Sequence, residues 1–485
     1  MSNDIRNLDP VALWNNFSDL NAVPRGSKKE EKVIAFMVAF GKKLGLKTIV
    51  DPIQNVIIKK PATPGMENRK TIVMQSHLDM VHQKNSDTDF DFDKEGIKMY
   101  IEDGWVKADG TTLGADNGLG VAAIMSVLES SDIPHPAIEA LFTIDEETGM
   151  TGAKGLEAGY LEGEILLNLD TEEDDEIDIG CAGGVDVTGT KTYNEINLNG
   201  NSQAFKISVI GLKGGHSGMD IHRGLGNANK IMNEIFEGTQ KLIHIAEIQG
   251  GSLRNAIPRE SFATVICDTT NAGNFIAKAE EVASKIKNDF KEIEPDLEFI
   301  FEVTESPLKA MDSDEQSKLI SAIKNAHNGV FKMSEVMEGL VEASNNIAKV
   351  NVKEGKIQIE CLTRSSVESS KMEVADQLRT AFENEGYEVT LSGDYPGWSP
   401  NADSPILGVM KNLYEEIFDK KPDVVACHAG LECGILGTNY PDMDMISFGP
   451  TIKGAHSPDE RANIKSAQKF WKFLLETLKN IPVKA

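Results

Sequence analysis

The sequence predicts an α/β domain, with a mixed, largely parallel central sheet flanked by helices, interrupted by an inserted α+β domain. Three observations predict this fold. Strand-like and helix-like segments alternate over the first 180 residues, the texture changes near residue 184, and the alternation returns after residue 395. Such alternation is typical of a sheet that is parallel where helices connect its strands. We place the first domain at residues 1–184 and 396–485, and the inserted domain at residues 185–395.

The elements of the first domain follow from hydrophobic periodicity. Helices are expected at residues 9–20 and 28–44, and the apolar run GLGVAAIMSVL at residues 118–128 is expected to be a buried helix. Runs rich in β-branched and other apolar residues predict strands at 55–59, 71–75, 139–144 and 164–169. After the insertion, a helix at 405–418, strands at 424–426 and 444–448, and a helix at 466–480 would complete the first sheet.

The inserted segment alternates strands and helices differently. Strands are expected at 203–210, 262–268, 297–303 and 387–391, with a hairpin at 348–362 that turns at Lys353-Glu354-Gly355-Lys356. Helices are expected at 227–236, 275–290, 312–327 and 371–385. This order resembles two α+β units in succession, without a sequence repeat between them.

Composition excludes several classes of protein. A chain of 485 residues is long enough for two domains, because a single core seldom grows past about 250–300 residues. The formal net charge of -27 argues against a nucleic-acid partner and against adsorption to an anionic membrane, since both need a basic face. Five scattered cysteines form neither a disulfide framework nor a CxxC motif, and neither a secretory signal nor an apolar run of membrane-spanning length is evident. We therefore expect a cytoplasmic protein.

Acidic and histidine residues gather at the ends of predicted strands. The strand at 71–75 leads into His77 and Asp79, whose spacing of two places them on one face, where Asp79 can orient the imidazole. The strand at 164–169 leads into Asp170. Ligands of open α/β sheets commonly bind outside these carboxyl ends, so a site is expected there.

Three further positions each have an ordinary explanation as well as a functional one. Asp116 lies in a glycine-flanked turn before the buried helix, where it is either a helix N-cap or a carboxylate that bridges two metal ions. Glu147 ends the run Asp145-Glu146-Glu147, which is either a solvated loop or a set of charges relieved by cations. His456 is either an ordinary loop histidine or a ligand.

These residues are more informative together. Two histidines and three carboxylates provide nitrogen and oxygen ligands without thiolates, which suits zinc, cobalt or manganese. If Asp116 bridges two ions, His77 and Asp170 can complete one site while Glu147 and His456 complete the other.

A family resemblance rests on motifs in a fixed order along nearly the whole chain. These motifs are HLDM, TTLGADNG, EETG, NLDTEE, GCAGG, KGGHSG, GSLRNAIPRE, YPGW, HAGLECG and PTIKGAHSPDE. In this order they resemble the zinc-dependent superfamily of aminoacylases, carboxypeptidase G and dipeptidases, and look most like its bacterial aminoacylhistidine (Xaa-His, carnosinase-like) dipeptidases. The resemblance implies a di-metal peptidase catalytic domain interrupted by a lid domain, two Zn²⁺ per subunit with Co²⁺ or Mn²⁺ as alternatives, and a dipeptide substrate such as β-alanyl-histidine.

The resemblance also implies residue roles. His77, Asp116 and Asp170 look like the ligands of one metal, and Asp116, Glu147 and His456 like those of the other. Asp79 looks like the residue that orients His77, and Glu146 like the general base. In the lid, His216 matches a histidine that stabilises the oxyanion, and Asn255 and Arg364 match substrate-binding positions. The ordinary alternatives are a loop histidine for His216 and a surface arginine for Arg364.

Other interpretations stay open at this point. The same metals serve N-acyl-amino-acid deacylases and tripeptidases, and a chain that had lost its base would be an inactive metal-binding scaffold. Relatives include homodimers, whereas a doubled lid would make one chain self-sufficient. Cys427, His428, Glu432 and Cys433 look like a metal cluster, but the family has no such third site, so we expect packing and a wall of the active site.

Overall fold

The computed structural model describes residues 4–198 and 200–484, which form two compact units. The first unit contains residues 1–180, 400–426 and 431–485, and the second contains residues 181–399 and 427–430. The sequence-based boundaries at 184/185 and 395/396 each differ from this division by four residues. Backbone hydrogen bonds in both directions between Cys181 and Trp398 explain the difference, because they tie residues at both ends of the insertion to each other.

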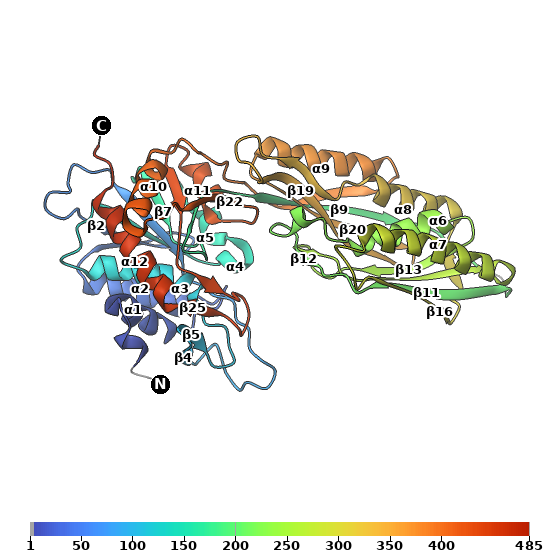
Figure 1. The fold of residues 1–485 in the computed structure, drawn as a ribbon, viewed down its shortest axis with the longest axis horizontal. Helices are drawn as coiled ribbons and strands as arrows, with labels where there is room; N and C mark the ends of the chain where they lie inside the picture. Colours follow the sequence, from blue (N-terminus) through green and yellow to red (C-terminus); the bar gives the residue numbers. More distant parts are fainter. Residues whose placement is uncertain (1–3, 199, 485) are drawn as a thin grey trace. The chain divides into compact units, whose positions relative to one another are not determined.

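The first unit is built on an eight-stranded mixed sheet (Figure 1). In spatial order its strands are β1 (Lys47–Val50), β2 (Val56–Lys60), β6 (Ile138–Thr143), β3 (Ile72–His77), β7 (Ile165–Asn168), β23 (Asp444–Ser447), β8 (Glu176–Cys181) and β22 (Asp423–Cys427). The four central strands, β6, β3, β7 and β23, are parallel, and antiparallel pairs flank them. The carboxyl ends of the four parallel strands therefore meet at one edge of the sheet.

Helices cover this sheet, and a small second sheet lies in the same unit. The helices are η1 (Ile5–Asn7), α1 (Val11–Asn21), α2 (Glu31–Lys43), α3 (Ala115–Glu129), α4 (Glu146–Gly149), α5 (Thr151–Gly155), α10 (Pro405–Phe418), α11 (Glu432–Asn439) and α12 (Ile464–Lys479). The small sheet has the order β24 (Ile452–Lys453), β25 (Arg461–Asn463), β5 (Trp105–Ala108) and β4 (Met99–Glu102). Helix α3 is buried over nearly its whole length, as expected for a helix that is apolar on all sides.

The second unit is built on one nine-stranded antiparallel sheet. Its strands in order are β16 (Glu298–Thr304), β11 (Ser202–Ile210), β15 (Ser261–Asp268), β13 (His244–Gly250), β19 (Val341–Lys353), β20 (Lys356–Ser365), β9 (Gly183–Thr192) and β21 (Glu388–Tyr395), with β18 (Gly329–Met333) beside β19. Two short pairs accompany it: β10 (Glu195–Asn197) with β17 (Lys309–Met311), and β12 (Gly215–His216) with β14 (Ala256–Ile257). Strand β13 pairs with both β15 and β19, so the sheet is continuous across the two successive α+β units that the sequence predicts.

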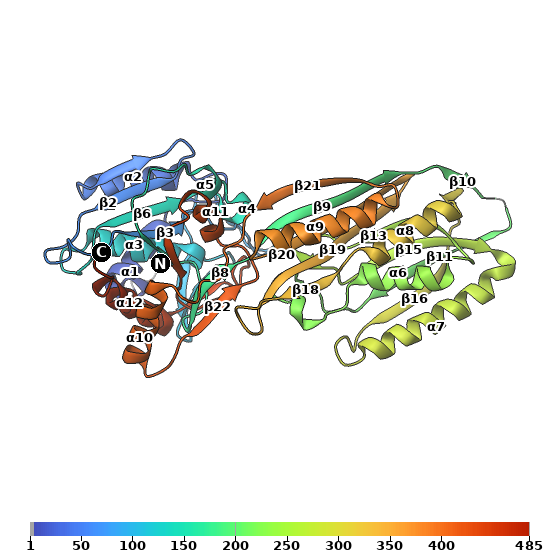
Figure 2. The ribbon, with the colours of Figure 1, turned by 90° about the horizontal axis from the view of Figure 1, so that it is seen from above.

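Helices cover one face of this sheet (Figure 2). They are α6 (Ala228–Thr239), α7 (Ala272–Phe290), α8 (Ser313–Asn325) and α9 (Glu368–Glu383), with the short helices η2 (Ile221–Arg223) and η3 (Thr269–Asn271) in the loops. The core between the helices and the sheet includes Phe205, Phe236, Phe275 and Phe382. Strand β13 alternates buried and exposed residues, which is the pattern of a sheet with one face packed and one face polar.

No helix within residues 4–198 and 200–484 is long and apolar enough to cross a membrane.

Candidate metal centre

His77 and Asp170 meet at the carboxyl edge of the first sheet. His77 is the last residue of β3, and Asp170 follows the end of the adjacent parallel strand β7, in which Asn168 is paired with Gln75. The His77 imidazole is buried, and its Nε2 lies 3.2 Å from Asp116 Oδ1 and 3.5 Å from Asp170 Oδ1. The first predicted trio of ligands therefore lies together in space.

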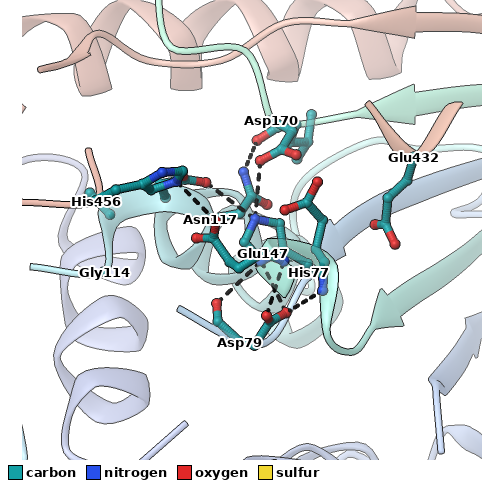
Figure 3. A network of polar contacts seen from close by, with 12 residues as sticks. His77, Asp79, Gly114, Asn117, Glu147, Asp170, Glu432 and His456 are labelled. Atoms are coloured by element: carbon teal, nitrogen blue, oxygen red, sulfur yellow. Dashed lines mark hydrogen bonds and ion pairs between the residues drawn. The ribbon is translucent and has the colours of Figure 1, made fainter. Parts of the chain in front are cut away.

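The second trio meets the first at Asp116. His456 Nε2 lies 3.1 Å from Asp116 Oδ2 and 2.9 Å from Glu147 Oε2, and Figure 3 shows both histidines directed toward the same group of carboxylates. Asp116 lies near the start of α3, but Gly114 occupies the N-cap position, and each Asp116 oxygen faces one histidine. The N-cap interpretation of Asp116 does not describe this side chain.

The geometry of these side chains fits two cations. Each histidine Nε2 lies close to two carboxylate oxygens, although one N–H can point well at only one acceptor. In each trio the ligand atoms lie within 4.8 Å of one another, which matches three ligands around a common centre. Glu147 Oε1 and Asp170 Oδ1 are buried without a hydrogen-bond partner, which is costly unless a cation or another group satisfies them. Imidazole and carboxylate ligands without thiolates suit zinc, cobalt or manganese.

The electrostatics of the site reflect buried carboxylates packed together. Burial, with the nearby Asp170 and other acids, raises the pKa of Glu146 well above its ordinary value. Burial also raises the pKa of Asp170. Burial disfavours a charged His77, but the Asp170 and Asp116 carboxylates outweigh burial and raise the pKa of His77 well above its ordinary value. Hydrogen bonds with Asp116 and Glu147 raise the pKa of His456 to about 11. Positive charge is therefore strongly favoured in this cluster.

Asp79 lies behind His77, on the side away from Asp116. His77 Nδ1 lies 3.2 Å from the backbone oxygen of Asp79 and 3.4 Å from its Oδ1. The Asp79 carboxylate also accepts hydrogen bonds from the backbone N–H groups of Glu146 and Glu147 and from Ser27 Oγ. One carboxylate thus contacts a histidine of the first trio and the loop that presents Glu147.

The three consecutive carboxylates after β6 have different environments. Asp145 accepts hydrogen bonds from the hydroxyl groups of Thr148 and Thr151, so its charge is satisfied within its own loop. Glu147 turns to His456, as described above. Glu146 lies between them in sequence and is half-buried, and the nearby Asp170, Glu147 and Glu432 disfavour its ionisation. The solvated-loop interpretation of this run is wrong, because Asp145 is buried and Glu146 and Glu147 are largely shielded from solvent.

Two residues that the sequence analysis did not select shape the turn before Asp116. The Glu460 carboxylate accepts hydrogen bonds at 2.7–3.3 Å from four consecutive backbone N–H groups, those of residues 113–116. Buried Arg25 donates to the backbone oxygens of Leu78 and Asp79 and, at 2.5 Å, to that of Gly114. Arg25 therefore connects the end of β3 to the same turn. A signal existed for Glu460, which lies in the motif GAHSPDE, but nothing in the sequence pairs it with residue 113.

The second unit contains the remaining predicted residues. His216 lies in β12, and its Nδ1 accepts hydrogen bonds from the backbone N–H groups of Gly218 at 3.2 Å and Met219 at 3.0 Å. A neutral imidazole with an accepting Nδ1 has its proton on Nε2. The backbone N–H of His216 donates to Asp220 Oδ2 at 2.9 Å, which further orders the loop. His216 is thus prepared to donate a hydrogen bond from Nε2.

Asn255 and Arg364 lie in the same unit as His216. Asn255 is exposed, and its backbone oxygen accepts a hydrogen bond from Ser217 N, in the loop next to His216. Arg364 is buried on β20 and donates from Nη1 to the Tyr395 hydroxyl at 3.0 Å, while its Nε has no partner. Because Arg364 is buried, the surface-arginine alternative is wrong. No carboxylate among the described residues forms an ion pair with its guanidinium group.

The residues Cys427, His428, Glu432 and Cys433 do not act together as a metal cluster. They are absent from the metal-compatible groups found within residues 4–198 and 200–484. His428 Nε2 instead lies 2.8 Å from Ser344 Oγ in the second unit, and Glu432 forms hydrogen bonds with Gln75 and Thr143 in the first. A third group of acids, Glu30, Asp79 and Asp145, accepts hydrogen bonds from backbone N–H and hydroxyl groups.

Comparison with known proteins places the chain in a family. Residues 73–480 match the family model described as peptidase family M20/M25/M40. The chain belongs to this family. The M20 assignment confirms the resemblance predicted from the ordered motifs, together with the α/β fold class and the peptidase activity.

Two relatives align with this M20 chain over almost its whole length. The chain is 41% identical over 483 residues to the cytosol non-specific dipeptidase of Escherichia coli strain K12, which covers 99% of this chain and 100% of that protein. The crystal structure of the aminoacylhistidine dipeptidase from Vibrio alginolyticus is 44% identical with a TM-score of 0.91, and the match covers 99% of both chains. The structure of aminopeptidase PepT from Bacillus cereus, 17% identical with a TM-score of 0.58 over 98% of this chain and 99% of that one, shares the fold.

The contacts of Glu460 lead to a prediction about metal binding. Glu460→Gln replaces one accepting oxygen by an NH₂ group that faces backbone donors, so the turn before Asp116 should shift. We expect the affinity for Zn²⁺ to fall about 10- to 100-fold, as is usual when residues behind the ligands are changed. Isothermal titration of the metal-free protein measures this affinity.

Glu139→Gln is the matched control for this substitution. Glu139 is also buried and also accepts hydrogen bonds from two backbone N–H groups, those of Glu162 and Gly163, but it lies near the other end of β6. Both variants should be less stable than the wild type. If both weaken metal binding equally, the effect of Glu460 is general destabilisation and the prediction fails.

Proposed function

We propose that this protein is a metallodipeptidase that hydrolyses dipeptides of the Xaa-His type, including β-alanyl-histidine. The observation that supports it most strongly is the Asp116 carboxylate, which faces a histidine of each trio with a different oxygen. Membership of the M20 family and the similarity to two proteins named as dipeptidases also support the proposal.

The two trios are proposed to bind two Zn²⁺ ions per subunit, with Co²⁺ or Mn²⁺ as alternatives. His77, Asp116 and Asp170 would hold one ion, and Asp116, Glu147 and His456 the other. When bound, such ions lower the pKa of a water molecule and polarise the scissile carbonyl group. The unsatisfied oxygens of Glu147 and Asp170 support this assignment.

Glu146 is proposed as the general base. It accepts the proton of the attacking water and passes it to the amine that leaves when the amide bond breaks. Its position supports this role, since the backbone N–H of Glu146 is fixed by Asp79 and its neighbour Glu147 faces His456. Asp79 is proposed to orient His77 through the Nδ1 side of the ring, which leaves Nε2 directed at the ligand cluster.

His216 is proposed to donate a hydrogen bond to the oxyanion of the tetrahedral intermediate. The accepting Nδ1 supports this role because it leaves the proton on Nε2 without requiring a charged ring. Arg364 is proposed to bind the terminal carboxylate of the dipeptide, and Asn255 to contact the substrate. A buried guanidinium without an ion-pair partner favours an anionic ligand, and an arginine can bind a carboxylate with two parallel hydrogen bonds.

The alternative functions also involve bound metal. An N-acyl-amino-acid deacylase or a tripeptidase would share the two trios and differ in the substrate pocket. An inactive metal-binding scaffold is disfavoured because Glu146 and all five proposed ligands are present and lie together. The name of the Escherichia coli relative supports a cytoplasmic location. A homodimer remains the proposal for the assembly, with a self-sufficient single chain as its alternative.

A substrate panel tests the proposed function directly. The metal-replete protein should cleave β-alanyl-histidine and other Xaa-His dipeptides with higher kcat/KM than tripeptides or N-acyl amino acids. Release of free histidine or amino acid, measured by chromatography, gives the rates. A clear preference for N-acyl amino acids or for tripeptides would replace this proposal by the corresponding alternative.

Substitution of the base should separate chemistry from metal binding. Glu146→Gln keeps the shape of the side chain but cannot accept the proton, so kcat should fall about 10²- to 10⁴-fold. Metal content, measured by atomic emission, should remain that of the wild type. Glu157→Gln, an exposed glutamate nearby in the chain, is the control and should retain activity. Wild-type turnover by Glu146→Gln would exclude Glu146 as the base.

Substitution of Arg364 tests whether the substrate needs a free terminal carboxylate. In Arg364→Met, kcat/KM for a dipeptide should fall on the order of 10²-fold, since a buried charge pair is lost. The rate for the corresponding dipeptide amide should change little. Arg254→Met is the control, because Arg254 lies in the same unit but already pairs with Asp186 and Glu360. An unchanged ratio of dipeptide to amide in Arg364→Met would contradict the assignment.

A further inference from the structure

A continuous chain of buried polar side chains crosses the first sheet. We call it the polar layer, and its members are Glu432, Thr143, Gln75, Asn168, Ser447, Thr171 and Asp178. Glu432 Oε2 accepts hydrogen bonds from Gln75 Nε2 and Thr143 Oγ1, both at 2.6 Å, and Gln75 Oε1 accepts one from Asn168 Nδ2 at 2.5 Å. Beyond Asn168 the chain continues through Ser447 and Thr171 to Asp178 Oδ2.

The polar layer follows the order of the strands. Thr143, Gln75, Asn168, Ser447 and Asp178 come from β6, β3, β7, β23 and β8, which are consecutive neighbours in the sheet. Thr171 and Glu432 come from the loop after β7 and from the first turn of α11. The layer therefore links five adjacent strands through side chains, in addition to their backbone hydrogen bonds.

The polar layer lies directly next to the proposed ligands along the strands. Gln75 precedes His77 by two residues, and Asn168 precedes Asp170 by two. Residues two apart on a strand point to the same face, so Gln75 lies one step before His77 on its face of β3. Thr143 likewise ends β6, immediately before the loop that presents Glu146 and Glu147. In Figure 3, Glu432 is drawn on the other side of His77 from His456.

The hydrogen bonds of the polar layer require one more proton than its amide and hydroxyl groups can donate. The contacts Asn168–Ser447, Ser447–Thr171 and Thr171–Asp178 are three hydrogen bonds in series. Asn168 turns its oxygen to Ser447, because its NH₂ group donates to Gln75. Only the two hydroxyl groups remain as donors for three bonds. The third proton belongs to the Asp178 carboxyl group, which then donates to Thr171, Thr171 to Ser447, and Ser447 to Asn168.

If the amide groups of Asn168 and Gln75 are both reversed, a proton is still required, but on Glu432 instead of Asp178. If Asn168 donates to Ser447, the two hydroxyl groups suffice and Asp178 can be ionised. Gln75 must then reverse as well, which places its oxygen 2.6 Å from Glu432 Oε2, where two acceptors face each other. That contact is a hydrogen bond only if Glu432 is protonated. In either arrangement one of the two terminal carboxyl groups holds a proton.

We infer that the polar layer is a positioning element of the metal centre, completed by one proton on a terminal carboxyl group, Asp178 in the arrangement seen. The positioning role rests on the proposed function, whereas the proton follows from the hydrogen bonds alone. Burial is consistent with a neutral group at either end, because it raises the pKa of Asp178 to about 7 and that of Glu432 to about 8.

Infrared spectroscopy of the metal-free protein at neutral pH tests for the proton. We expect a carbonyl band of a protonated carboxyl group that shifts on ¹³C-aspartate labelling and is absent in Asp178→Asn. In the reversed arrangement, the band shifts on ¹³C-glutamate labelling instead and is absent in Glu432→Gln. If neither substitution removes such a band, the inferred proton does not exist and the inference is overturned.

Metal titration tests the positioning role with two matched serine variants. Ser447→Ala interrupts the polar layer, and its affinity for Mn²⁺ should fall about 10- to 100-fold. Ser126→Ala is the control, because Ser126 is equally buried in α3 and also loses two hydrogen bonds, those with Asn16 and Ala122. Thr171→Val interrupts the layer without changing the side-chain shape and replaces Ser447→Ala if that variant does not fold.

The outcomes separate this inference from the proposed function. Wild-type affinity in both Ser447→Ala and Thr171→Val, in a protein that binds metal, would overturn the positioning role and leave the dipeptidase proposal intact. A wild-type chain that binds no Mn²⁺ or Zn²⁺ would overturn the metal centre and the positioning role together. The infrared result decides the proton in each case, since it needs neither metal nor substrate.

Discussion

The arrangement of the first unit depends on the carboxylate of Asp116, whose two oxygens face His77 and His456. Several other carboxylates lie buried nearby, and acids so placed repel one another unless positive charge lies among them. The histidines, and the cations that their arrangement fits, provide that charge. Arg25 and Glu460 have a different task, since they fix the backbone of the turn that leads into Asp116. The position of one side chain is thus determined by contacts from three separate segments, which contain Arg25, His77, and the loop of His456 and Glu460.

The parallel strands explain why so many of these residues could be predicted. His77 and Asp170 follow adjacent parallel strands, so their position at one edge is a consequence of the fold. Glu147 follows the third strand of the group, β6. Asp116 lies in the non-helical first turn of α3 and His456 in a loop, and no periodic pattern places a side chain at either position. Each of these two residues taken alone also has an ordinary explanation, which for His456 is the favoured one, and the resemblance in ordered motifs distinguished between the alternatives.

What could not be predicted depends on contacts between distant segments. Glu460 lies 344 residues after Asp116, and it contacts backbone N–H groups, which leave no trace in residue identity. Glu432 looked like part of a cluster with Cys427, His428 and Cys433, although its partners are Gln75 and Thr143. The continuity of the second sheet was missed for the same reason. The pairing of β13 with β19 joins segments about a hundred residues apart, and the strand pattern alone does not specify that pairing.

The polar layer raises the question of why seven buried positions are not apolar. Buried polar groups usually contribute less to stability than well-packed apolar side chains, but they are costly to mispair. Leucine or valine at Gln75 and Asn168 would tolerate small shifts between β3 and β7, whereas two amides bonded at 2.5 Å fix one register. A shift of that kind would move His77 against Asp170, because both follow these residues by two positions. The side chains of β3 and β7 therefore fix the register of these two strands next to the proposed ligands. The proton on one terminal carboxyl group completes the hydrogen bonds of the layer and leaves only the other terminal carboxyl group to carry a charge.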